Sequence, residues 1–162
     1  MSMNCVDWNG ADAFCKWVGG SIPTKDEWFA EATNGGAWKF PWGNQDASSD
    51  YVLETGVDYT KPNCSKPKGN SVSGVCDLYG GLFEWLGSFS DANKSYPEFN
   101  MPSSNNIKYI SNSVPTFKMY TVGFRCVKSA ASTGQLGMNS TTNAGNNSID
   151  LIDWINVPSG SF

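Results

Sequence analysis

The chain has 162 residues, of which 16% are charged, with a net charge of −4 and a pI of about 4.7. This length suits one domain with its own core, and the few charges beside seven Trp and 17 Gly indicate a loop-rich fold rather than a helical bundle. The acidic balance argues against binding to nucleic-acid phosphates, and the lack of a long apolar run argues against a membrane span. The lack of histidine excludes Ser-His-Asp catalysis, Cys-His catalysis and imidazole zinc sites.

The first predicted element is an amphipathic helix over residues 7–18. Asp7 is the expected N-cap, and Gly19-Gly20 is expected to end the helix. Apolar side chains recur at the i, i+3, i+4 and i+7 spacing of one helix face, at Ala11, Phe14, Cys15 and Val18.

A second helix is predicted to start at Pro23-Thr24. Thr24 is the expected N-cap, and Glu27 stands three residues later as its capping-box partner. Asn34-Gly35-Gly36 supplies the stop signal of this helix.

The middle of the chain shows less periodicity. Residues 44–75 read as a long loop region, and the apolar residues 81–86 predict a buried strand. Residues 87–113 are polar, and residues 119–128 alternate enough to predict a closing strand.

The tail changes in composition. Residues 129–148 are rich in Ser, Thr, Asn, Gly and Ala, as in a linker, whereas residues 149–162 are strand-like. We therefore divide the chain into a domain over 1–128, a polar linker over 129–148 and a strand over 149–162 that completes the same domain.

Six short motifs follow one another in a fixed order along residues 4–128. They are Asp7-Trp8-Asn9 with Phe14-Cys15, Pro23-Thr24 with Glu27-Trp28, Gly35-Gly36, the stretch from Phe40 to Asn44, the stretch from Asp77 to Trp85, and Gly123-Phe124-Arg125-Cys126. Read together, these motifs resemble the formylglycine-generating-enzyme (sulfatase-modifying factor) family. The resemblance implies an α+β, C-type lectin-like fold of the formylglycine-generating-enzyme type, with two short helices around a small antiparallel sheet.

The end of the tail, Val157 to Phe162, resembles the strand that opens this family's fold. Two interpretations are a circularly permuted strand order and the truncated start of a following repeat, and a third is an unrelated strand with a chance pattern. A flexible stretch of about 20 residues spans roughly 25 Å, which is enough for the permuted order.

The resemblance also places a catalytic pair of cysteines between the last two motifs, where family enzymes hold copper with two thiolates and oxidise a substrate cysteine. Residues 86–122 contain no cysteine here. We therefore expect no copper and predict that the chain is not an enzyme. An active or degenerate enzyme of this family is the alternative.

The five cysteines stand at 5, 15, 64, 76 and 126, so at least one is free or pairs between chains. The family resemblance implies a Cys15–Cys126 disulfide, which a loop-entropy estimate values at about 3–5 kcal/mol. Cys64 and Cys76 are candidates for a local pair. The alternative is that all five are thiols in a reducing compartment.

A calcium site is also implied by the resemblance. Its ligands are the side chains of Asp77 and Glu84 and the carbonyls of Gly80 and Leu82, a set of hard oxygen donors that suits a structural Ca²⁺. Gly81 stands where the family usually has Asn. The alternative is that Glu84 hydrogen-bonds buried backbone amides beside Trp85.

The polar stretch 87–121 falls, in C-type lectin-like folds, on the exposed ligand-binding face. Its Tyr, Ser and Asn content is typical of antibody paratopes, and it resembles the variable proteins of diversity-generating retroelements, some of which use this fold. The predicted ligand-binding residues are Ser88, Ser90, Asp91, Asn93, Tyr96, Asn105, Asn106, Lys108, Tyr109 and Asn112. A polar surface without a partner is the alternative.

We therefore predict a ligand-display protein that binds a protein or glycan on a cell or host surface, and that is extracellular, on the cell surface or part of a virion. A structural module of a surface or virion protein is a further alternative. We expect the tryptophans at 8, 17, 28, 38, 42 and 85 to serve as core and packing residues.

Overall fold

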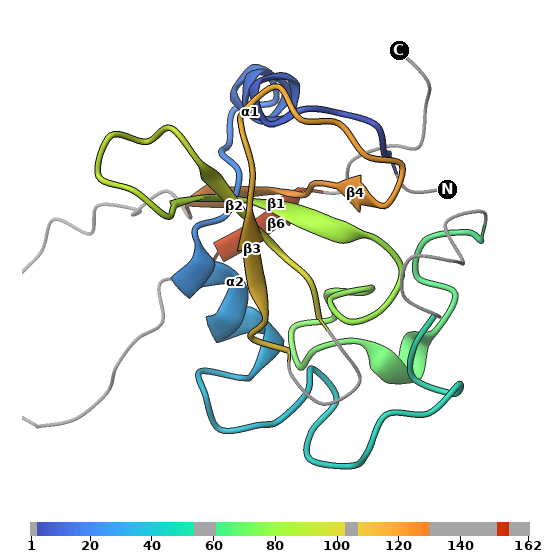
Figure 1. Cartoon of the computed structure of the whole chain (residues 1–162). Helices are drawn as coiled ribbons and strands as arrows, with labels where there is room; N and C mark the ends of the chain where they lie inside the picture. The colour runs from blue at the N-terminus through green and yellow to red at the C-terminus, as the bar shows by residue number, and fades with distance from the viewer. Residues whose placement is uncertain (1–2, 54–60, 103–106, 130–151, 156–162) are drawn as a thin grey trace, which may run out of the picture.

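The computed structural model describes residues 3–53, 61–102, 107–129 and 152–155. Its helices are α1 (Trp8–Trp17), α2 (Lys25–Ala32) and the short 3-10 helix η1 (Pro67–Gly69). Its strands are β1 (Phe83–Phe89), β2 (Pro97–Asn100), β3 (Ile110–Asn112), β4 (Val122–Gly123), β5 (Cys126–Ser129) and β6 (Ile152–Ile155) (Figure 1). In the part of the chain that is described, no helix is long and apolar enough to cross a membrane.

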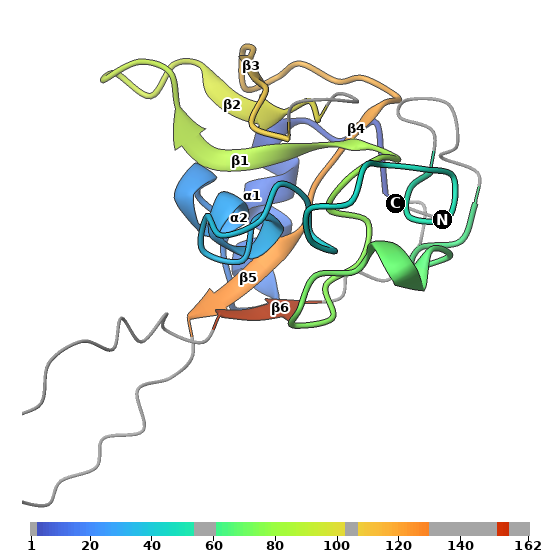
Figure 2. The same ribbon diagram turned by 90° about the horizontal axis from the view of Figure 1, so that it is seen from below.

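The strands form a four-stranded sheet in the order β3-β2-β1-β4 and a separate two-stranded ladder of β5 and β6. Both helices lie between the sheet and the ladder (Figure 2). The expected α+β fold with two short helices is confirmed. The sheet is mixed rather than wholly antiparallel, because β4 runs parallel to β1 while β1–β2 and β2–β3 are antiparallel.

Both predicted helix starts are confirmed. The Asp7 side chain accepts a hydrogen bond from the Gly10 N–H, 2.8 Å away, and caps α1. Thr24 and Glu27 form the expected capping box at the start of α2. The turn after α2 contains Gly35 and Gly36, both with positive φ, as a helix stop requires.

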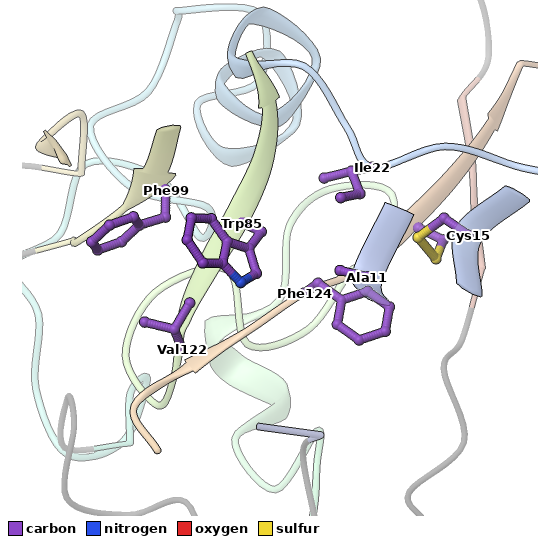
Figure 3. Packing of buried hydrophobic residues seen from close by; sticks show 8 residues of the cluster. Ala11, Cys15, Ile22, Trp85, Phe99, Val122 and Phe124 are labelled. Carbon is purple, nitrogen blue, oxygen red and sulfur yellow. A yellow bond between two sulfur atoms is a disulfide. The ribbon is translucent and has the colours of Figure 1, made fainter. Parts of the chain in front are cut away.

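Trp85 on β1 is the centre of the first hydrophobic cluster (Figure 3). Its ring contacts Phe99 of β2 edge-to-face, with centroids 5.3 Å apart, and its indole N–H donates to the Val6 carbonyl over 2.9 Å. In return, the Trp8 indole donates to the Leu86 carbonyl over 2.9 Å. Since a buried indole needs an acceptor, these two bonds join the start of α1 to β1.

A second hydrophobic cluster lies around Trp28 of α2 and takes in residues from the loop region. Its buried members are Trp28, Ala32, Phe40, Leu78, Tyr79, Leu86 and Ile107. Outside its short helix and isolated bridges, the described part of the predicted loop region 44–75 has no regular structure, so aromatic packing holds it in place. Trp42, for example, stacks between Phe40 and Tyr51, with centroid distances of 4.9 and 5.0 Å.

The predicted closing strand is divided in two at Phe124-Arg125. Its first part, β4, pairs with β1, and its second part, β5, pairs with β6. Gly123 ends the first part, where a Cβ atom would lie 2.4 Å from the Met3 carbonyl oxygen. A glycine is therefore required at the point where the N-terminal segment crosses β4.

The expected tail strand is present as β6, which pairs antiparallel with β5 from Cys126 opposite Ile155 to Ser129 opposite Ile152. Most of the predicted linker and the end of the tail, including the Val157–Phe162 motif, lie outside the described residues. The permuted order and the repeat start therefore stay predictions.

Two sequence predictions are wrong. Trp17 is 80% exposed rather than part of the core; it is the last residue of α1, and its ring packs against Phe14 with centroids 5.7 Å apart. The polar stretch after residue 86 also contains a fully buried strand, β2, whose Glu98 and Asn100 are both buried. The polar residues of β2 break the alternation of apolar and polar residues by which a strand is recognised in a sequence, so the strand was not predicted.

The capping box at the start of α2 provides a stability test. Replacing Thr24 with Ala removes the hydroxyl that accepts the Glu27 N–H, and we expect the free energy of unfolding to fall by about 1 kcal/mol in urea denaturation. The exposed Thr116→Ala variant, outside any helix, serves as the control and is expected to change stability by less than about 0.5 kcal/mol. Equal effects of the two variants would contradict the capping role.

Candidate functional site

Two apolar stretches of the sequence each carry a single charge. Glu84 interrupts residues 82–86, and Arg125 interrupts residues 122–127. A charge inside an apolar run is costly to bury unless it is paired, so each charge requires the other or a comparable partner.

The structure brings these two charges together in the core. Arg125 Nη2 lies 2.6 Å from Glu84 Oε1, and Arg125 Nε lies 2.7 Å from Oε2, which is a bidentate pair. The two side chains are only 14% and 11% exposed. The Trp28 indole N–H donates to Oε2 over 2.9 Å, so three family motifs meet at one carboxylate.

Arg125 also hydrogen-bonds to the backbone at the start of the motif that runs from Asp77 to Trp85. Its Nη1 and Nη2 groups each donate over 3.2 Å, to the carbonyl oxygens of Cys76 and Asp77 respectively. The guanidinium carbon lies 5.5 Å from the ring centroid of Trp154, which places this cation beside the tail strand β6. The indole N–H of Trp154 in turn donates to Glu31 of α2 over 3.3 Å.

The predicted calcium ligands do not form an open oxygen cage in this arrangement. Both Glu84 oxygens are engaged by Arg125 and Trp28. The Asp77 Oδ2 atom accepts the Cys64 N–H over 2.7 Å. Burial raises the pKa of Asp77, and that hydrogen bond opposes the shift. Glu84 as placed is paired with a cation supplied by the chain itself, and the calcium site stays a prediction.

All five cysteines lie in the described part of the chain. Cys15 and Cys126 form a disulfide with a sulfur–sulfur distance of 1.94 Å and join α1 to β5, and Cys64 pairs with Cys76. Cys5 is the one free thiol and is exposed. Two thiolates are needed to hold copper in the way the family resemblance implies, so the folded chain with both disulfides intact does not fit that ion.

The predicted ligand-binding residues fall into two groups. Ser90, Asp91, Asn93 and Tyr96 belong to the turn between β1 and β2, which projects from the sheet (Figure 1). The Asp91 Oδ1 atom accepts the N–H groups of Ser95 and Tyr96, each over 2.9 Å. Desolvation acts to raise the pKa of Asp91, but the hydrogen bonds together outweigh it and the net shift is downward.

Asn112 lies on β3 at the same end of the sheet, because its neighbour Ser113 donates its N–H to the Pro97 carbonyl over 3.2 Å. Lys108 and Tyr109 lie at the opposite end of β2, where the Met101 N–H donates to the Tyr109 carbonyl. With about 3.3 Å per residue along a strand, Tyr96 and Tyr109 are roughly 15 Å apart.

The other three predicted residues belong to neither group. The Ser88 hydroxyl accepts the Lys25 N–H over 2.8 Å and faces the start of α2. Asn105 and Asn106 lie outside the described residues. We use the name hairpin surface for the exposed turn residues Ser90 to Tyr96 together with Asn112.

Sequence reasoning missed the buried ion pair between Glu84 and Arg125 and the place of Trp154 beside it. The signal for the pair was present, since each residue is the lone charge of an apolar run. It also missed the pairing of Lys25 with the buried Glu98, whose nitrogen and oxygen lie 3.0 Å apart. No local pattern links residues so far apart in the sequence.

The buried pair leads to a second stability prediction. Replacing Glu84 with Gln removes the negative charge and leaves Arg125 without its partner, so we expect the free energy of unfolding to fall by about 3 kcal/mol in urea denaturation. Asp46→Asn, which breaks a pair whose side chains are 47% and 91% exposed, is the control and is expected to cost less than about 0.5 kcal/mol. A Glu84→Gln effect no larger than the control would contradict this account.

Comparison with known proteins agrees with this geometry. The chain is 33% identical to the inactive C-alpha-formylglycine-generating enzyme 2 of Mus musculus over 95 residues, which is 51% of this chain and 30% of that protein. It is 28% identical to the formylglycine-generating enzyme of Bos taurus over 147 residues, which is 79% of this chain and 39% of that protein. The chain thus spans 30% to 39% of the length of these relatives.

The fold is also that of a solved bacterial structure. PvdO from Pseudomonas aeruginosa superposes with a TM-score of 0.61 and 18% identity, covering 75% of this chain and 59% of that one. The C-type lectin-like architecture predicted from the motifs is consistent with this likeness.

These relatives correct one prediction. The expectation that the chain is not an enzyme is wrong as a statement about its family, because the bovine relative is a formylglycine-generating enzyme, although the mouse relative is inactive. The missing cysteines of residues 86–122 were therefore too narrow a basis for that conclusion. Residues 1–130 match the family model described as the sulfatase-modifying factor enzyme 1-like domain. The chain belongs to this formylglycine-generating-enzyme family.

Proposed function

We propose that this chain is a domain of a formylglycine-generating-type enzyme that acts on a polypeptide, and that the hairpin surface binds this substrate. The observation that carries the proposal is the similarity to the bovine formylglycine-generating enzyme across 79% of this chain. The burial of Glu84 with Arg125 and Trp28 supports it, because the motifs shared with the family meet in space.

The hairpin surface has the chemistry that binding to an extended polypeptide requires. Tyr96 is 47% exposed and offers an aromatic ring and a hydroxyl. Asn112 is exposed beside it on β3. The turn is held by the Asp91 carboxylate and by the Ser90 N–H, which donates to the Tyr96 carbonyl over 3.0 Å. A rigid turn loses little conformational freedom when it binds a partner.

The test measures binding of a fluorescently labelled cysteine-containing peptide by fluorescence anisotropy, since the chain with both disulfides intact offers no pair of thiolates for copper and binding is read without turnover. We expect the chain to bind the peptide. We expect Tyr96→Ala to raise the Kd roughly fivefold, because truncating an exposed aromatic contact of this size costs on the order of 1 kcal/mol of binding.

Tyr109→Ala is the matched control. Tyr109 is 51% exposed, close to the value for Tyr96, but it lies at the far end of β2. We expect its Kd for the peptide to stay within about twofold of the unaltered chain. The absence of peptide binding would overturn the proposal, and equal losses in the two variants would overturn the assignment of the hairpin surface.

A second candidate is ligand display of the kind seen in retroelement variable proteins, in which the hairpin surface binds a protein or glycan. The specific observation is that the turn is closed by Asp91 and by backbone groups of Ser95 and Tyr96. Asn93, Lys94 and Ser95 are exposed. The side chains of Asn93 and Lys94 can therefore change without altering the hydrogen bonds that close the turn, whereas the Ser95 side chain also hydrogen-bonds to Asp91.

Sequencing of this gene across isolates tests the second candidate. We expect substitutions to concentrate at residues 92–96 and 112 while Asp91 stays constant, because only Asp91 supplies the closing carboxylate. Uniform variation across the scaffold and the turn would contradict display.

The proposed location is extracellular, on a cell surface or on a virion. The two disulfides support it, since such bonds persist in oxidising compartments and are rare in the cytosol.

A further inference from the structure

The two disulfides of the chain lie in different environments. Cys15 and Cys126 are both 0% exposed and belong to the first hydrophobic cluster. Cys64 is exposed and Cys76 is half-buried, at the edge of the loop region. An external thiolate has to reach a sulfur atom before it can break a disulfide, so only the second pair is open to attack.

The second pair also closes a shorter loop. Its cysteines are separated by 12 residues, whereas 111 residues separate Cys15 from Cys126. A disulfide that closes a short loop removes less entropy from the unfolded chain. The fold therefore depends less on the Cys64–Cys76 bond than on the buried one.

The loop between Cys64 and Cys76 is anchored by contacts that do not involve the sulfur atoms. Gly69 packs so closely on Tyr51 that a Cβ atom would lie 1.9 Å from the Tyr51 carbonyl oxygen. The Ser71 and Ser73 hydroxyls both donate to the Glu31 carboxylate of α2. These contacts remain when the disulfide is broken, so reduction leaves the loop in place.

Each cysteine backbone is held separately as well. The Cys64 N–H donates to Asp77 Oδ2 over 2.7 Å, and the Cys76 carbonyl accepts from Arg125 Nη1 over 3.2 Å. Both sulfur atoms and an Asp77 carboxylate oxygen lie within 4.8 Å of one another. A reduced pair stays close enough to close again.

From these observations we propose that Cys64 and Cys76 form a thiol–disulfide exchange site that accepts two electrons from a thiol substrate. This inference does not depend on the proposed function, since it uses neither the hairpin surface nor peptide binding. Cys64 is the sulfur that is attacked, and Cys76 is the sulfur that leaves.

The exchange has two steps. A substrate thiolate bonds to the Cys64 sulfur while the Cys64–Cys76 bond breaks, and Cys76 departs as a thiolate that takes a proton from water. A second substrate thiolate then bonds to the first substrate sulfur and releases Cys64 as a thiolate, which is protonated in the same way. The two substrate thiols are oxidised to a disulfide, and the cysteine pair is reduced to two thiols.

The first test uses the full chain with Cys5→Ser, which removes the one free thiol. The protein is equilibrated in buffers with a rising ratio of reduced to oxidised glutathione and then quenched and alkylated, and each cysteine is read by mass spectrometry. We expect Cys64 and Cys76 to be reduced at a glutathione ratio at least tenfold lower than Cys15 and Cys126. We also expect the near-ultraviolet circular dichroism of the buried tryptophans to be unchanged at that point.

Reduction of both disulfides together, or reduction of Cys64–Cys76 only with loss of the near-ultraviolet signal, would overturn the proposal.

A second test assigns the attacked sulfur. With Cys5 already replaced, the Cys76→Ser variant leaves Cys64 as a single thiol, and the Cys64→Ser variant leaves Cys76. We expect oxidised glutathione to form an adduct at Cys64 at least tenfold faster than at Cys76, and equal rates would overturn the assignment of Cys64.

Discussion

The bidentate pair between Glu84 and Arg125 is the contact on which the rest of this structure depends. Taking a carboxylate and a guanidinium out of water costs several kcal/mol for each ion, and the cost is offset only when nearly every donor and acceptor finds a partner. Arg125 meets this requirement with the Glu84 carboxylate and two backbone carbonyls. The pair thus specifies one arrangement of several segments that are distant in the sequence.

Those segments include the hairpin surface, which is proposed to bind substrate, and the proposed Cys64–Cys76 exchange site. Glu84 lies on β1, which continues into the hairpin surface, and Arg125 holds the backbone of Cys76 in the exchange site. The same guanidinium stacks on Trp154 of the tail strand. One ion pair therefore positions a projecting turn, an exposed disulfide and the final strand, although these features lie on different parts of the molecule.

The helices could be predicted from the sequence because their signals are local. Asp7 and Thr24 stand within three residues of the N–H groups that they cap. The motifs likewise indicated the fold, because the resemblance rests on their order. β2 could not be predicted, since its buried Glu98 and Asn100 bind partners on other segments, such as Lys25 and the Glu84 N–H.

The candidate site was predicted less well, for the same physical reason. The family resemblance implied calcium at Glu84, whereas the group that the structure places against this carboxylate is a guanidinium from 41 residues further along the chain. The ligand-binding residues were treated as one surface, whereas β2 separates Tyr96 from Tyr109. Distances between residues far apart in the sequence depend on strand pairing, which a composition-based reading does not contain.

The pairing of β5 with β6 has a consequence for synthesis of the chain. Ile152, where β6 begins, lies 23 residues after Ser129, where β5 ends. At the usual rate of roughly 5–20 residues per second, the ribosome takes about one to five seconds to add them. During that interval the β5 backbone has no partner on the side that β6 will occupy, and an unpaired strand edge is a template for association with other chains. The nascent protein therefore passes through a brief period in which it is most prone to aggregate, and this period ends when Trp154 arrives beside Arg125.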